Sequence, residues 1–289
     1  MKHKYFFLSL TLIFLLFIIS TVTVIEAGVI MYRDIRYFND SSGAMEWHKL
    51  DLYRPTGKAL LPVLVFAHGG GLIMGNKSMY PGLGERLANM GFLVAMTGYG
   101  HSPEIKFPEH AKNVARAITW LQRNAGKYGG DPNKIFLMGH SAGGYLVSLL
   151  ALDHKYLEEE GGNPYYIKGV ISISGIYTIY SLRAERRDEF FQKIITPAFE
   201  DDFDTLKDAS PLTHVNSSAP PFLILWAEKE LPFIRDQGEN MLRAMEEAGC
   251  NVTGQKIKGR NHSSIMTWFG TREDPAGKIF KRWLKRVGK

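Results

Sequence analysis

The sequence Gly-His-Ser-Ala-Gly, from Gly139 to Gly143, encloses a serine between two glycines. A serine hydroxyl is a weak nucleophile until a neighbouring base takes its proton. A sharp turn from strand to helix exposes such a serine above a sheet, and the crowding in that turn requires small flanking residues. The apolar run 135–138 precedes the motif, and a stretch compatible with a helix, 142–152, follows it. This context predicts that Ser141 is a nucleophile; the alternative is a glycine-rich turn with an idle serine.

A second chemical signal is the run His-Gly-Gly-Gly, from His68 to Gly71, at the end of the apolar stretch 63–66. When a carbonyl group is attacked, negative charge develops on its oxygen, and main-chain N–H groups aimed at that oxygen stabilise it. Glycine lets the main chain approach closely and adopt conformations barred to other residues. We therefore expect the N–H groups of Gly70, Gly71 and Ala142 to form an oxyanion hole. We expect His68 to order this loop rather than to act in catalysis.

A base and an acid would complete this chemistry, and hydrolases with this serine turn carry them in the order serine, acid, histidine. His262 lies in a polar loop after the last predicted strand, and no histidine follows it. We predict that His262 is the general base; the alternative is an ordinary surface histidine. The acid is expected just past the apolar run 222–226, where a buried carboxylate would orient the imidazole. We predict Glu230 for this role, and Glu228 and Asp236 remain as alternatives.

The elements that would position these residues alternate between strands and helices. Continuous apolar runs predict strands buried on both faces, and amphipathic spacing predicts helices. The predicted strands cover 35–38, 47–53, 62–66, 92–96, 135–138, 170–174, 222–226 and 253–257, and the predicted helices cover 83–90, 108–128, 142–152, 234–248 and 276–287. Such alternation is typical of an α/β fold with a mostly parallel central sheet and helices on both faces. Residues 176–214 interrupt the alternation, and we interpret them as a small cap insertion.

The composition is that of an ordinary globular chain of 289 residues, 45% hydrophobic and 22% charged, with a formal net charge of +6. The single cysteine, Cys250, excludes an intramolecular disulfide and argues against a cysteine-based metal site. The basic residues form no stripe interleaved with aromatic residues in the middle of the chain, so we predict no nucleic-acid partner. The predicted chemistry needs no cofactor and no metal.

The N-terminus has the pattern of an export signal, because a basic start is followed by the uncharged residues 5–25. A signal peptide would be cleaved after a small residue such as Ala27, whereas an uncleaved anchor needs about 20 apolar residues to cross a membrane. Either alternative exports the rest of the chain, since the basic flank lies on the N-terminal side. We therefore assign 1–27 to a signal peptide or signal-anchor and 28–289 to the hydrolase domain, which we expect to be membrane-anchored, periplasmic or secreted.

Together these motifs resemble the branch of the α/β-hydrolase superfamily that contains esterases and lipases with an HGGG oxyanion motif. The resemblance extends from Trp47 to the C-terminus. It includes four further segments, 99–103, 129–132, 228–237 and 259–263. The last two resemble the acid-bearing and histidine-bearing segments of small carboxylesterases and kynurenine formamidase-like enzymes. The resemblance implies the α/β-hydrolase fold, with aspartate more usual than glutamate at the position matched to Glu230.

The sequence therefore predicts a serine hydrolase that cleaves carboxylic esters through an acyl-enzyme intermediate, with a small-molecule ester as its substrate. The membrane would be a second partner if the N-terminal segment stays uncleaved. Two alternatives remain. The same residues could hydrolyse an amide, as in an enzyme of the arylformamidase type. A membrane-tethered binding protein could also keep the fold without catalysis, although the intact serine, histidine and glycine set argues against this.

Overall fold

The computed structural model of the protein describes residues 23–26, 28–39, 46–57, 60–185 and 191–288. Within these residues the strands are β1 Thr23–Glu26, β2 Val29–Arg36, β3 Lys49–Pro55, β4 Leu61–Ala67, β5 Leu93–Thr97, β6 Gly130–His140, β7 Ile167–Ile173, β8 Phe222–Lys229 and β9 Val252–Asn261. The α-helices are α1 Leu83–Asn89, α2 Glu109–Asn124, α3 Ala142–Leu152, α4 Lys155–Glu159, α5 Thr196–Ala198, α6 Phe203–Asp208, α7 Gln237–Glu247, α8 Ser264–Thr267 and α9 Pro275–Arg286.

The described strands form one sheet in the order β1-β2-β3-β5-β4-β6-β7-β8-β9. The pairs β1–β2, β2–β3 and β3–β5 are antiparallel, and the remaining pairs, from β5–β4 to β8–β9, are parallel. The parallel strands therefore share one edge at which their carboxyl ends lie together. Ligands of open α/β sheets bind outside such an edge. The loops after β4, β6, β8 and β9 carry the four predicted groups of site residues and all begin there.

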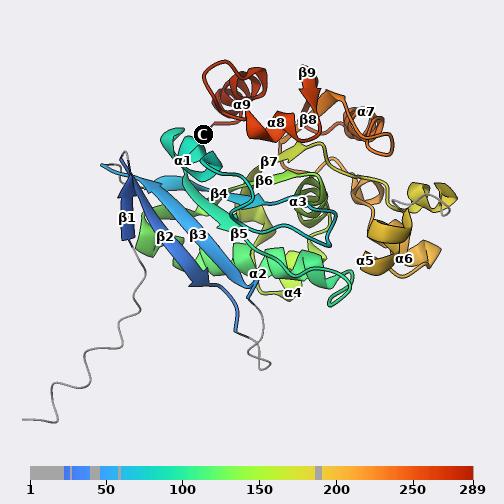
Figure 1. Ribbon diagram of the computed structural model, residues 1–289, viewed down its shortest axis with the longest axis horizontal. Helices are drawn as coiled ribbons and strands as arrows, with labels where there is room; N and C mark the ends of the chain where they lie inside the picture. Colours follow the sequence, from blue (N-terminus) through green and yellow to red (C-terminus); the bar gives the residue numbers. More distant parts are fainter. Residues whose placement is uncertain (1–22, 27, 40–45, 58–59, 186–190, 289) are drawn as a thin grey trace, which may run out of the picture.

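Helices cover both faces of the sheet, and β4 shows how the sequence achieves this. Successive side chains of a strand point to opposite faces. Val63 and Val65 belong to the core that contains residues of α2 and α3, whereas Leu64 and Phe66 belong to the core that contains residues of α1 and α9. Figure 1 shows α1 and α9 on one side of the sheet and α2 on the other. The unbroken apolar run of β4 is thus explained by burial on both faces, and the predicted fold class is confirmed.

The first strand of the hydrolase domain was predicted wrongly. The sequence pattern favoured a strand over 35–38, but β2 covers Val29–Arg36. Its pairing with β3 shifts between Tyr32 and Ile35, and Asp34 adopts a positive φ of 55°. This bulge inserts polar residues into the strand, so the alternation of apolar and polar side chains that identifies a strand is lost there.

Part of the segment predicted to direct export belongs to this sheet. Residues 1–22 and Ala27, which include most of the apolar run and the suggested cleavage position, lie outside the described residues. Thr23–Glu26 form β1, paired with β2. In the part of the chain that the structure describes, no helix combines the length and the apolar character needed to cross a membrane.

The segment predicted as a cap lies between β7 and β8. Its described part is made of short helical turns, namely η3 Tyr180–Glu185, η4 Phe191–Ile195, α5, α6 and η5 Pro211–His214. Figure 1 shows α5 and α6 together at one end of the molecule. Ser210 links the end of this segment to its beginning, because its hydroxyl accepts the N–H of Ile179 at 2.8 Å. The segment supplies Ile194, which lines the cavity described below.

Candidate active site

Ser141 lies in the turn between β6 and α3, with φ 55° and ψ −119°. A Cβ atom on Gly139 would lie 2.2 Å from the carbonyl oxygen of Gly143, and a Cβ atom on Gly143 would lie 2.1 Å from that of Ala67. Both distances are far below van der Waals contact, so only glycine fits at either position. A positive φ at a serine costs on the order of 1–3 kcal/mol. The N–H of Ser141 donates to the carbonyl oxygen of Ile173 at 2.9 Å, which helps to hold this turn.

The glycine loop after β4 needs its glycines for similar reasons. Gly70 and Gly71 have φ values of 121° and 63°. A Cβ atom on Gly70 would lie 2.0 Å from the carbonyl oxygen of Met74. The carbonyl oxygen of Gly70 accepts the N–H groups of Ile73 and Met74, both at 3.1 Å. The loop therefore has one defined conformation, which fixes the direction of its main-chain N–H groups.

The side chain of His68 stabilises the conformation of this loop. Its Nδ1–H donates to the carbonyl oxygen of Gly69 at 2.7 Å, and its ring stacks on Tyr99 with centroids 4.1 Å apart. The hydroxyl of Tyr99 donates to the carbonyl oxygen of His68 at 2.8 Å. Burial lowers the pKa of His68 to about 4, so the ring is neutral near pH 7. These contacts fit the ordering role predicted for His68.

The structure brings His262 and Glu230 together. Nδ1 of His262 lies 2.8 Å from Oε2 of Glu230, whose side chain is 1% exposed. A carboxylate can only accept, so Nδ1 carries the hydrogen. Nε2 of His262 is then the ring nitrogen left to act as a base.

Glu230 is held as a carboxylate. The N–H of Ala227 donates to its Oε1 at 2.9 Å, and the hydroxyl of Ser174 donates to the same oxygen. Burial alone would raise the pKa of Glu230, but the hydrogen bonds from His262, Ser174 and Ala227 lower it below its ordinary value. Glu230 is therefore ionised near neutral pH and can stabilise a positive charge on His262.

The two alternative acids lie elsewhere. Glu228 is exposed near the end of β8, and its Oε2 accepts the N–H of Gly259 at 2.9 Å. Asp236 is exposed immediately before α7. Only Glu230, the first residue after β8, contacts His262 among these three acids.

Ser141, His262, Gly70 and Gly71 line one cavity of about 490 Å³, which we call the serine cavity. Its volume is within the range of about 300–1,000 Å³ that is usual for small-molecule sites. Ala142 is the first residue of α3, so its N–H has no partner within the helix. The remaining walls are mainly apolar and include Met79, Ile176, Ile194, Leu231 and Phe233. The predicted serine, histidine and loop glycines thus face a common space.

Sequence reasoning missed three residues of this region. The sequence pattern predicts Ser174 only as the last residue of a strand, yet its hydroxyl contacts the Glu230 carboxylate. Tyr80 and His140 line the serine cavity and are hydrogen-bonded to each other at 2.9 Å. His140 stands within the serine motif itself, which was the one available signal. No local pattern marks its partner, because Tyr80 lies 60 positions away.

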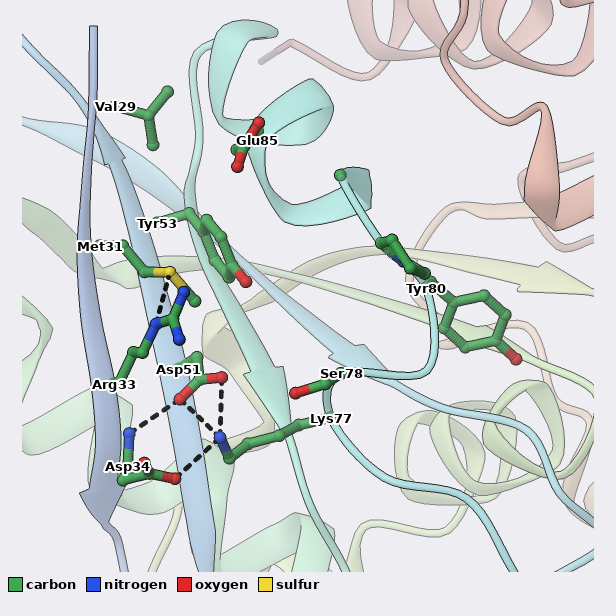
Figure 2. Close-up of a pocket in the computed structure, with 12 residues that line it drawn as sticks. Val29, Met31, Arg33, Asp34, Asp51, Tyr53, Lys77, Ser78, Tyr80 and Glu85 are labelled. Atoms are coloured by element: carbon green, nitrogen blue, oxygen red, sulfur yellow. Dashed lines mark hydrogen bonds and ion pairs between the residues drawn. The ribbon is translucent and has the colours of Figure 1, made fainter. Parts of the chain in front are cut away.

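A second cavity, of about 410 Å³, lies beside β2, β3 and the segment before α1; we call it the charged cavity. Figure 2 shows Nζ of Lys77 between the carboxylates of Asp34 and Asp51. The nitrogen lies 2.9 Å from Oδ1 of Asp34 and 2.7 Å from Oδ1 of Asp51. Tyr80 borders both cavities. In Figure 2 its ring extends away from these charges.

The sheet order, the serine turn after β6 and the loops at the carboxyl ends of the strands define an α/β-hydrolase. Comparison with known proteins narrows this class. The profile of the BD-FAE family matches residues 50–244, and the chain belongs to that family.

Named relatives are esterases. Esterase LipQ of Mycobacterium tuberculosis (strain ATCC 25618 / H37Rv) is 32% identical over 226 residues, which cover 75% of this chain and 53% of LipQ. Esterase LipC of the same organism is 28% identical over 267 residues, covering 88% of this chain and 65% of LipC. The chain thus spans between about half and two thirds of the length of these relatives. The crystal structure of esterase B from Lactobacillus rhamnosis superposes with a TM-score of 0.76 at 19% identity, covering 92% of this chain and 87% of esterase B, which shows a shared fold.

Proposed function

We propose that this protein is a serine hydrolase that cleaves small carboxylic esters through an acyl-enzyme intermediate. The observation that carries the proposal is the 2.8 Å contact between His262 and the buried carboxylate of Glu230, beside a cavity that Ser141 also lines. The esterase names of the relatives LipQ and LipC support an ester as the substrate.

In the acylation step, Nε2 of His262 takes the proton of the Ser141 hydroxyl while Oγ forms a bond to the ester carbonyl carbon. The electron pair of the carbonyl π bond moves onto its oxygen, and the N–H groups of Gly70, Gly71 and Ala142 stabilise the resulting negative charge. One such donor is worth about 3–4 kcal/mol of transition-state stabilisation. The bond from carbon to the alcohol oxygen then breaks, and His262 gives its proton to the departing alcohol.

In the deacylation step, water replaces the alcohol. His262 takes a proton from water as the water oxygen bonds to the acyl carbon, and the same N–H groups stabilise the second oxyanion. The bond to Oγ of Ser141 breaks, the acid is released, and the proton returns to Oγ. Glu230 holds the tautomer and orientation of His262 throughout and stabilises its cation.

The apolar walls of the serine cavity favour an ester whose acyl or aryl group is hydrophobic. A panel of p-nitrophenyl esters graded by acyl length, measured together with N-formylkynurenine, tests both the reaction and this preference. We expect esters to be hydrolysed with kcat/KM values above that of the amide. Faster turnover of N-formylkynurenine than of every ester would favour amide hydrolysis instead.

We also propose that the N-terminal segment directs export of the hydrolase domain. The uncharged stretch 5–25 after a basic start supports this proposal. Fractionation of cells that express the full chain is the test. Recovery of the protein in the cytoplasmic fraction alone would contradict export, and release from membranes by high salt would contradict an anchor.

A further inference from the structure

Three loops meet at the wall of the serine cavity, and Tyr80 and His140 connect them. The N–H of Gly69, in the glycine loop, donates to Oη of Tyr80 at 3.1 Å. Oη of Tyr80 lies 2.9 Å from Nδ1 of His140, the residue before the nucleophile. Nε2 of His140 lies 2.9 Å from the main-chain carbonyl oxygen of His262. One chain of hydrogen bonds thus runs from the glycine loop to the loop of the general base.

The direction of each hydrogen bond in this chain follows from its partners. A carbonyl oxygen can only accept, so Nε2 of His140 carries a hydrogen. His140 is only 5% exposed, and burial lowers its pKa to about 3. The ring is therefore neutral, and its Nδ1 accepts the hydroxyl hydrogen of Tyr80. Burial raises the pKa of Tyr80 to about 12, so this hydroxyl keeps its hydrogen.

Packing holds the same groups in place. A Cβ atom on Gly69 would lie 3.0 Å from Oη of Tyr80 and 3.1 Å from Nδ1 of His140, so the glycine loop rests directly on the pair. The ring of Tyr80 meets Phe66 edge to face, with centroids 5.2 Å apart. The rings of His140 and His262 have centroids 4.7 Å apart.

The segment that carries Tyr80 is anchored at its other end. Lys77 is bound to Asp34 and Asp51 in the charged cavity, as Figure 2 shows. The main chain then leads over three residues to Tyr80, which turns its ring toward the serine cavity. The charged cavity therefore supports the position of Tyr80 without taking part in its hydrogen bonds.

We propose that Tyr80 and His140 are positioning residues, which fix the general base relative to the oxyanion loop by hydrogen-bonding to the main chain of both. This inference rests on the proposed ester hydrolysis. Glu230 holds the ring of His262 through Nδ1, and His140 holds the backbone of His262 through its carbonyl oxygen. Two fixed points on one residue restrict where Nε2 can lie. Misplacing a catalytic group by about 1 Å can cost on the order of 100-fold in rate.

Two substitutions of His140 separate its two hydrogen bonds. In His140→Gln the side-chain nitrogen takes the place of Nε2 and can still donate to the carbonyl oxygen of His262. In His140→Asn the side-chain oxygen takes the place of Nδ1 and can accept from Tyr80, but the donor to His262 is lost. We expect kcat for a p-nitrophenyl ester to fall about ten-fold or more in His140→Asn and about three-fold in His140→Gln, with KM changed less than about two-fold in either.

Tyr80→Phe tests the other half of the chain and keeps the ring that packs on Phe66. We expect kcat to fall about ten-fold while the melting temperature stays close to that of the wild type. The matched control is Tyr165→Phe, which removes a hydroxyl from an exposed tyrosine and should leave kcat and KM unchanged.

The outcomes separate this inference from the proposed function. If Ser141→Ala abolishes turnover while His140→Asn and Tyr80→Phe keep wild-type kcat, the positioning role is wrong and the proposed function stands. If Ser141→Ala keeps turnover, the proposed function itself fails. If His140→Asn does not fold, Tyr80→Phe decides the question. Equal losses in His140→Gln and His140→Asn would contradict the role assigned to the donor at Nε2.

Discussion

Tyr80 lines both the serine cavity and the charged cavity. A buried carboxylate lies at each of them, and the two carboxylates are paired with different kinds of side chain. In the charged cavity Asp51, with a side chain 3% exposed, is paired with Lys77. Beside the serine cavity the side chain of Glu230 is buried to a similar degree, but it is paired with His262, which lines that cavity. A lysine paired with a carboxylate keeps its proton near pH 7, whereas an imidazole can exchange one. The partner of the buried carboxylate, rather than the polarity of the cavity, therefore indicates where chemistry can occur.

The largest expected effect separates the serines of the two cavities. Ser141→Ala removes the nucleophile, and we expect the turnover of a p-nitrophenyl ester to fall by about 10⁴-fold or more. Ser78 is an exposed serine in the charged cavity, so Ser78→Ala should keep wild-type turnover. Steady-state kinetics of the two purified variants make the comparison. A similar loss in both would show that the assignment of chemistry to one cavity is wrong.

The acid paired with His262 gives the next largest effect. Glu230→Gln keeps the shape of the side chain but removes the charge that fixes the tautomer of His262, so we expect kcat to fall about 10³-fold. Glu228→Gln is the matched control, because Glu228 is exposed and contacts only the N–H of Gly259 among the hydrogen bonds described. Its kcat should stay within about two-fold of the wild type. A larger loss of kcat in Glu228→Gln than in Glu230→Gln would show that Glu228 is the acid.

The charged cavity is expected to matter for stability. Lys77→Met leaves the buried carboxylate of Asp51 without its cation, and we expect the free energy of unfolding to fall by about 3 kcal/mol. The control is Lys256→Met, which breaks an exposed ion pair with Glu239 and should cost less than about 1 kcal/mol. Urea unfolding of both variants measures the difference. Equal small losses would mean that the charged cavity does not stabilise the fold.

The smallest effect concerns pH and the neutral state of His140. Burial lowers the pKa of His140 to about 3 in the folded chain, whereas the residue titrates at about pH 6.5 when the chain is unfolded. Between these two pH values the unfolded chain therefore binds one more proton at His140 than the folded chain does. The folded state should therefore lose about 1.4 kcal/mol per pH unit through this residue as the pH falls from 6 to 4. Urea unfolding of the wild type and of His140→Gln over this range tests the sign, since other groups contribute equally to both. A stability difference between the two proteins that does not change with pH would contradict a buried neutral His140.

Local sterics made much of the fold and the site predictable. Glycine is forced at Gly139 and Gly143 by contacts of about 2 Å that any Cβ atom would make, so the serine turn is visible in five consecutive residues. Strands buried on both faces, such as β4, are visible as unbroken apolar runs. The bounds of α3 match the prediction, and its start does so because the turn fixes where the helix begins.

Long-range contacts explain what the sequence did not reveal. Glu228 and Glu230 are two residues apart, and only the point at which β8 ends decides which of them reaches His262. The contact from His140 to His262 spans 122 positions, and no local pattern marks it. Most of β2 was not predicted, because the bulge at Asp34 interrupts the side-chain pattern of the strand. Contacts of Asp34 with Lys77 and Asp51, far along the chain, hold this bulge.

A covalent adduct on the nucleophile would identify Ser141 directly. The wild-type protein is treated with a fluorophosphonate probe, digested, and analysed by mass spectrometry. We predict one adduct per chain, on Ser141, and no adduct in Ser141→Ala under the same conditions. An adduct on another serine, or labelling of Ser141→Ala at the wild-type rate, would contradict it.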